Sequence, residues 1–144
     1  MKFGELIGMF KESNKVTKSH MKNLFEMAMV DSNFDDTEFE LLEKLAQKHK
    51  VSEKELKIIK EDPDKIKFEL PKNADEKFEQ FFELVHMMTI DNEIFDAELN
   101  LCKIFAKKFG YEKGEELVSV ISQNINNGQD WKETKTRVDM YNMI

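Results

Sequence analysis

The chain has 144 residues, of which 40% are hydrophobic and 35% charged, and its formal net charge is −7. This composition is typical of one soluble globular domain, and the acidic balance argues against nucleic acid or an anionic membrane as partner. The single cysteine, Cys102, excludes an internal disulfide and a cysteine-rich zinc site. We find no apolar run near the ~20 residues that cross a bilayer and no signal peptide, so we expect a cytoplasmic protein without membrane insertion.

The first half of the chain predicts four helices. Apolar residues recur at intervals of three and four, the spacing of amphipathic helices. We expect a short helix that ends near Ser13 and Asn14, then helices from about 17, from about 35 and from about 52. Asp62-Pro63-Asp64 ends the fourth, since the residue before proline avoids helical geometry. The expected inward residues are Phe3, Leu6, Ile7 and Phe10; Met21, Leu24, Phe25 and Ala28; Phe39, Leu42, Leu45 and Ala46; and Leu56 and Ile59.

The second half predicts four more helices after a connector that lies against the body of the protein. The first of them runs from about 74 to about 90 and the last begins near 130. Gly110 is well placed to end the second, and Asn126-Asn127-Gly128 stops the third. The expected inward residues are Phe78, Phe81, Phe82, Val85 and Met88; Leu99, Cys102, Phe105, Ala106 and Phe109; Leu117, Val120 and Ile121; and Trp131, Val138 and Tyr141.

An internal repeat at an offset of 60 residues organises this pattern. Leu24, Ala46 and Lys48 match Leu84, Ala106 and Lys108, and an acidic loop at 31–38 recurs at 91–98. Short loops make each helix pair an antiparallel hairpin. We therefore predict one all-α domain spanning 1–144, a helical bundle of seven to eight helices built from two repeated hairpins. The predicted boundaries are about 17–61 for repeat one, about 77–127 for repeat two and about 130–143 for a C-terminal helix.

The acidic loops hold the candidate chemical residues. Carboxylate and amide oxygens are the ligands that calcium and magnesium prefer. The candidate ligands are Asp31, Asn33, Asp35 and Glu38 in the first loop and Asp91 and Glu98 in the second. An EF-hand is excluded, because Asp36 stands where glycine is required and Leu42 where a bidentate glutamate is required. The alternative is that these acids only brace their turns by accepting hydrogen bonds from loop N–H groups.

The loops Asp31-Ser32-Asn33-Phe34-Asp35-Asp36-Thr37-Glu38 and Asp91-Asn92-Glu93-Ile94-Phe95-Asp96-Ala97-Glu98 resemble the tellurite-resistance TerB-like family. The resemblance covers about 21–128. It implies an all-α bundle of duplicated hairpins, links to tellurite and stress responses, metal binding by the loop acids, and no catalytic activity. Phe95 stands where the first loop has Asp35, so the first loop has the richer ligand set.

Outside the acidic loops, the sequence shows no pattern typical of a metal site or an enzyme. His20, His49 and His86 show no ligand spacing along the chain, so we expect each to be a surface or hydrogen-bonded helix residue. We find no catalytic triad, phosphate-binding loop or dinucleotide fingerprint, and therefore expect no enzyme. The two hypotheses left open are a module that binds a divalent cation (Ca or Mg) at the acidic loops, and a scaffold that binds a protein partner or itself.

Overall fold

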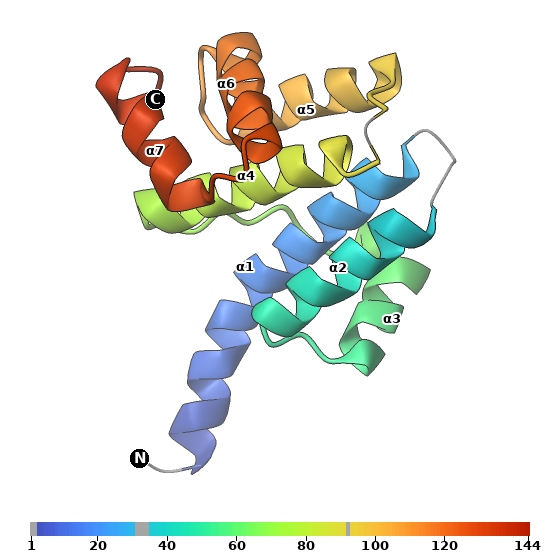
Figure 1. Cartoon of the computed structure of the whole chain (residues 1–144). Coiled ribbons are helices and arrows are strands. Elements are labelled where there is room, and N and C mark those ends of the chain that lie inside the picture. Colours follow the sequence, from blue (N-terminus) through green and yellow to red (C-terminus); the bar gives the residue numbers. More distant parts are fainter. Residues whose placement is uncertain (1–2, 31–34, 92) are drawn as a thin grey trace.

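The computed structural model describes the backbone of residues 3–30, 35–91 and 93–144, and side chains from residue 15 onward within those ranges. Seven α-helices and one 3₁₀ turn form in this part of the chain, which confirms the all-α prediction (Figure 1). None of these helices combines the length and apolar character that a bilayer span requires. The elements are α1 Phe3–Met29, α2 Asp36–Lys48, α3 Glu53–Glu61, η1 Pro63–Lys65, α4 Ala74–Thr89, α5 Asp96–Lys108, α6 Gly114–Asn126 and α7 Trp131–Met140.

Helix α1 corrects one prediction. Two helices were expected before residue 30, but one helix of 27 residues runs through Ser13 and Asn14. Serine and asparagine cost only some tenths of a kcal/mol inside a helix, and no proline or glycine follows them to end it. Its N-terminal half extends beyond the other helices (Figure 1). The side chains of the expected stripe from Phe3 to Phe10 lie outside the described part of the structure.

Helix α4 is the centre of the bundle. It packs against α1 and also contacts α5, α6 and α7, while α2 and α3 pack against α1 (Figure 1). A helix surrounded in this way must be apolar on most of its circumference. The fully buried apolar side chains of α4 are Phe78, Phe81, Leu84, Val85, Met87 and Met88.

Most of the expected inward residues are buried, including Cys102. Two predictions are wrong. Phe39 is 36% exposed, because α2 buries Leu41 in its place. The Lys60 ammonium lies 4.3 Å from the centre of the Phe39 ring. Tyr141 is 64% exposed, because α7 ends at Met140.

The connector between the halves lies against the body, as expected. Its apolar residues Ile66, Phe68 and Leu70 pack on the core. The backbone N–H of Glu69 donates to the Ser19 hydroxyl at 2.8 Å, which ties the connector to α1.

Helices α2 and α5 match each other at the offset of 60 seen in the sequence. Both have 13 residues, and their first and last residues differ by 60 in number. Both end in a Schellman motif: the Val51 N–H donates to the Ala46 carbonyl at 2.8 Å, and the Tyr111 N–H to the Ala106 carbonyl at 2.9 Å. A common origin of the two hairpins stays a prediction that this agreement supports.

The Schellman motif needs one residue with left-handed backbone geometry, which favours glycine. In α5 that residue is Gly110, with φ 85°, whereas in α2 it is Lys50, with φ 61°. A non-glycine residue pays a steric cost there, so the two equivalent turns differ in backbone strain.

We predict that Lys50→Gly raises the free energy of unfolding by about 0.5–1 kcal/mol, because glycine removes the strain of the positive φ. Lys50→Ala is the control, since it removes the lysine charge but keeps the strain. Urea denaturation of the two variants measures the difference. Equal stability of Lys50→Gly and Lys50→Ala would contradict the prediction.

Candidate functional site

The first group of candidate residues lies where the two acidic loops join their helices. Asp35 caps the N-terminus of α2, and its Oδ1 accepts a hydrogen bond from the Glu38 N–H at 2.9 Å. Glu38 in the first turn is only 1% exposed. Asp91 follows α4, and its Oδ1 accepts from the Glu93 N–H at 3.1 Å, as in an Asx turn.

Three carboxylates from the two loops converge. One carboxylate oxygen each of Asp35, Glu38 and Asp91 can be chosen so that all lie within 4.8 Å of one another. Two unit negative charges at such a distance repel by roughly 3 kcal/mol at an effective dielectric constant of 20. Within the described part of the chain, no lysine or arginine forms an ion pair with Asp35 or Asp91. A cation between these three carboxylates, which we call the acidic centre, would offset the repulsion.

The other predicted ligands divide into two groups. Glu98 is 1% exposed, and its Oε1 accepts a hydrogen bond from the Phe95 N–H at 3.3 Å, so it braces the start of α5. It is not a member of the acidic centre. Asp31 and Asn33 lie outside the described residues.

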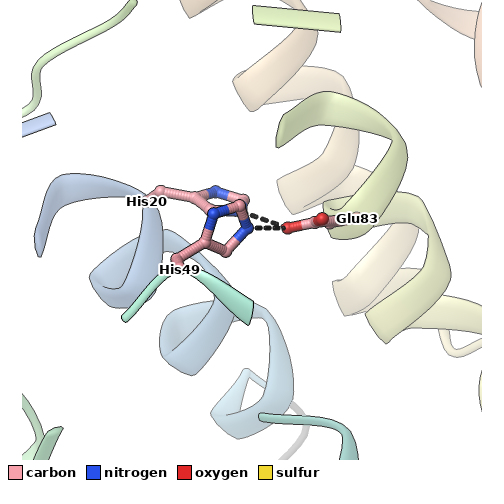
Figure 2. Close-up of side chains that lie close together, drawn as sticks. All are labelled: His20, His49 and Glu83. Atoms are coloured by element: carbon pink, nitrogen blue, oxygen red, sulfur yellow. Dashed lines mark hydrogen bonds and ion pairs between the residues drawn. The ribbon is translucent and has the colours of Figure 1, made fainter. Parts of the chain in front are cut away.

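A second group, which sequence reasoning missed, joins three helices. His20 on α1, His49 at the C-terminal end of α2 and Glu83 on α4 point toward one another (Figure 2). His20 Nε2 lies 2.7 Å and His49 Nε2 lies 2.8 Å from the same atom, Glu83 Oε1. The two rings meet edge to face, with centroids 5.2 Å apart. The histidines are therefore neighbours in space despite their lack of ligand spacing in the sequence. We call these three residues the His–Glu centre.

The second oxygen of Glu83 is held by a lysine. Lys48 Nζ lies 2.6 Å from Glu83 Oε2 and 3.0 Å from a Glu79 carboxylate oxygen. Glu83 is only 3% exposed, and a buried carboxylate requires charged or hydrogen-bonding partners on both oxygens. The three donors on Glu83 supply them.

The hydrogen bonds decide which group carries charge. Burial by itself would raise the pKa of Glu83, but the bonds from His20 and His49 outweigh it and hold that pKa well below its usual range. Burial lowers the pKa of His20, despite its hydrogen bond to Glu83. An ionised carboxylate only accepts, so each Nε2 carries the hydrogen that it donates. The His20 Nδ1 is then an acceptor, and it is buried without a partner among the described residues.

The His–Glu centre adjoins a cavity of about 410 Å³. Its lining residues are Val16, Thr17, His49, Pro71, Lys72, Glu76, Glu79 and Gln80. His49 belongs to both the cavity and the centre, and its side chain is 20% exposed. Solvent therefore reaches the centre from the side of His49, whereas His20 is buried and its side chain has no contact with solvent.

The chain has no match among known proteins in three comparisons. No protein-family model matches it, and no curated protein or solved structure does.

We predict that stability falls as the pH falls from 7. The pKa of His20 is lower in the folded chain than its unfolded value of about 6.5, so the unfolded chain takes up that proton first. The pKa of Glu83 is also lower in the folded chain, so its contribution is present above about pH 4.5 and is lost below it. Each extra proton bound by the unfolded chain costs up to about 1.4 kcal/mol per pH unit. Urea denaturation between pH 7 and pH 4 measures the slope.

Two glutamates on one helix provide the matched variants. Glu83→Gln should lower the free energy of unfolding by about 3 kcal/mol, because it breaks a buried charged network. It should also flatten the slope below pH 4.5. Glu79→Gln removes only a partner of the half-exposed Lys48 and should cost about 1 kcal/mol or less. Equal losses in the two variants would contradict the assignment of Glu83 as the centre of the network.

Proposed function

We propose that the chain is a non-enzymatic helical module that binds a hard divalent cation, calcium or magnesium, at Asp35, Glu38 and Asp91. The observation that carries this proposal is the convergence of the three carboxylates from two loops distant in the sequence. Three negative charges attract a dication strongly, and oxygen ligands suit both ions. Water would complete the coordination, as is usual for magnesium.

The way these acids are held supports binding more than simple bracing. The Oδ1 atoms of Asp35 and Asp91 brace the backbone, which leaves each carboxylate a second oxygen for a cation. A cation bound between the three carboxylates would also offset their mutual repulsion.

The loop resemblance to the TerB-like family agrees with this proposal. That resemblance implies that the acids of these loops bind metal. It also implies a link to stress responses such as tellurite resistance. We include a cytoplasmic stress-response role in the proposal on the strength of that resemblance alone.

A protein-interaction role is the second candidate, and one surface feature favours it. A hollow of about 410 Å³ beside the second loop is lined in part by Met88, Ile94, Leu99 and Val118. Ile94 is 50% exposed. Apolar surface next to a hollow is typical of protein interaction sites. In this reading the acids only hold the loops in place.

We predict that millimolar Ca²⁺ or Mg²⁺ raises the melting temperature of the chain and that Asp91→Asn removes most of this rise. A cation at 10 to 100 times its dissociation constant stabilises the folded state by about 1.4–2.7 kcal/mol. Asparagine keeps the Oδ1 acceptor for the Glu93 N–H, so the Asx turn survives. Without ions, Asp91→Asn should be at least as stable as the wild type, because one repulsive charge is gone. Differential scanning calorimetry of the wild type and of Asp91→Asn, each with and without the ion, measures these melting temperatures.

The control is Asp96→Asn, which removes an exposed acid of the same loop that is not in the acidic centre. It should keep the full response to ions. If the wild type does not respond to either ion, or if Asp96→Asn loses as much of the response as Asp91→Asn, cation binding at this centre is wrong.

A further inference from the structure

We propose that His20, His49 and Glu83 form a second metal centre, specific for a zinc-like transition-metal ion, with three protein ligands and an open fourth position. The ligands would be the Nε2 atoms of the two histidines and Oε1 of Glu83. This proposal does not depend on the acidic centre, which has only oxygen ligands.

The three proposed ligand atoms already lie close together. The two Nε2 atoms lie 2.7 and 2.8 Å from Glu83 Oε1; His20 belongs to α1, and His49 is the residue that caps the C-terminus of α2 (Figure 2). Zinc binds nitrogen at about 2.0–2.1 Å and carboxylate oxygen at about 2.0–2.2 Å, so tetrahedral ligand atoms stand roughly 3.3 Å apart. A shift of about half an ångström per contact would open the centre to that spacing. Side-chain adjustment supplies such a shift without a change of fold.

The identity of the donors selects the type of ion. Imidazole nitrogen suits zinc, copper and nickel, whereas calcium and magnesium prefer oxygen. Two histidines and one glutamate with an open position match the ligand set of many zinc sites that bind a water. The described residues therefore offer a hard-ion centre and a borderline-ion centre at separate places.

The surrounding charges accommodate a cation. With neutral histidines, Glu79 and Glu83 carry two negative charges and Lys48 one positive charge, which leaves a net charge of −1. Lys48 contacts Oε2 of Glu83 and not Oε1, so it orients the carboxylate without occupying the ligand atom. Outer partners of this kind commonly fix the orientation of metal ligands.

The cavity beside His49 supplies an entry path and space for the fourth ligand. Its volume of about 410 Å³ exceeds the ~30 Å³ share of one water many times. Glu76 and Glu79 line it, so the path to the centre is acidic on one side. An ion that arrives there meets His49 first.

Binding has an identifiable cost. Each imidazole must move its proton from Nε2 to Nδ1, and the His20 Nδ1 has no acceptor among the described residues. A buried N–H without an acceptor is unfavourable. The centre should therefore bind zinc more weakly than a closed four-ligand structural site.

Calorimetric titration of the full chain with Zn²⁺ tests the proposal. The buffer contains millimolar Mg²⁺, which competes with zinc for the oxygen ligands of the acidic centre. We expect one saturable zinc ion per chain. His49→Gln should weaken its affinity at least about tenfold, as loss of a ligand costs no less than loss of an outer partner. His49 lies at a helix end and is partly exposed, so this variant should fold, and circular dichroism checks that it does.

Two matched variants make the result specific. His86→Gln removes the third histidine, which is not a member of the centre, and Asp91→Asn alters the acidic centre; both should bind zinc like the wild type. Long-range ¹H–¹⁵N NMR should show the Nε2 resonances of His20 and His49 shifting together on addition of zinc.

Four results would overturn the proposal. The first three are no saturable zinc binding to the wild type at pH 7, undiminished binding by folded His49→Gln, and a loss of binding in His86→Gln equal to that in His49→Gln. Loss of zinc binding in Asp91→Asn alone would place the ion at the acidic centre and would also overturn it, while leaving the proposed function intact.

Discussion

The ionised carboxylate of Glu83 is the constraint around which the bundle is arranged. It lies in the middle of the most buried helix, where an unpaired charge would destabilise the fold strongly. Its two oxygens receive donors from α1 and α2, through His20, His49 and Lys48. Apolar packing of α1 against α4 could tolerate small slips, whereas these short bonds fix how the three helices meet. The network therefore supplies specificity of packing at the junction between the two halves of the chain.

Helix α2 links the two charged centres, with acidic residues at its N-terminus and basic residues at its C-terminus. Its N-terminus carries Asp35 and Glu38, where the helix dipole favours negative charge. Its C-terminus carries Lys48 and His49, where the dipole favours positive charge. The acidic centre and the His–Glu centre thus stand at opposite ends of one helix of 13 residues, roughly 20 Å long. Glu83 of the His–Glu centre lies on α4, and Asp91 of the acidic centre lies two residues after the end of that helix.

Helix identity and most of the core followed from the sequence, because amphipathic spacing is a local signal. The cap at Asp35, the end of α3 before Pro63 and the turn at Gly110 did so too, since each depends on neighbouring residues. The continuity of α1 did not, because Ser13 and Asn14 only weakly disfavour a helix. The His–Glu centre was invisible because it joins positions 20, 49 and 83, which only the packing of α1, α2 and α4 brings together. One signal was available: Glu83 interrupts the apolar run of α4, and a buried acid requires partners.

The most direct test of this account is NMR of the metal-free chain at pH 7, with ¹³C reporting on the Glu83 carboxyl and ¹⁵N on the His20 ring. The account predicts an ionised Glu83 that stays ionised well below the ordinary range of a glutamate, and a neutral His20 ring with its hydrogen on Nε2. A protonated Glu83 carboxyl, or a His20 ring with hydrogen on Nδ1 alone, would contradict the claim that this carboxylate joins the three helices.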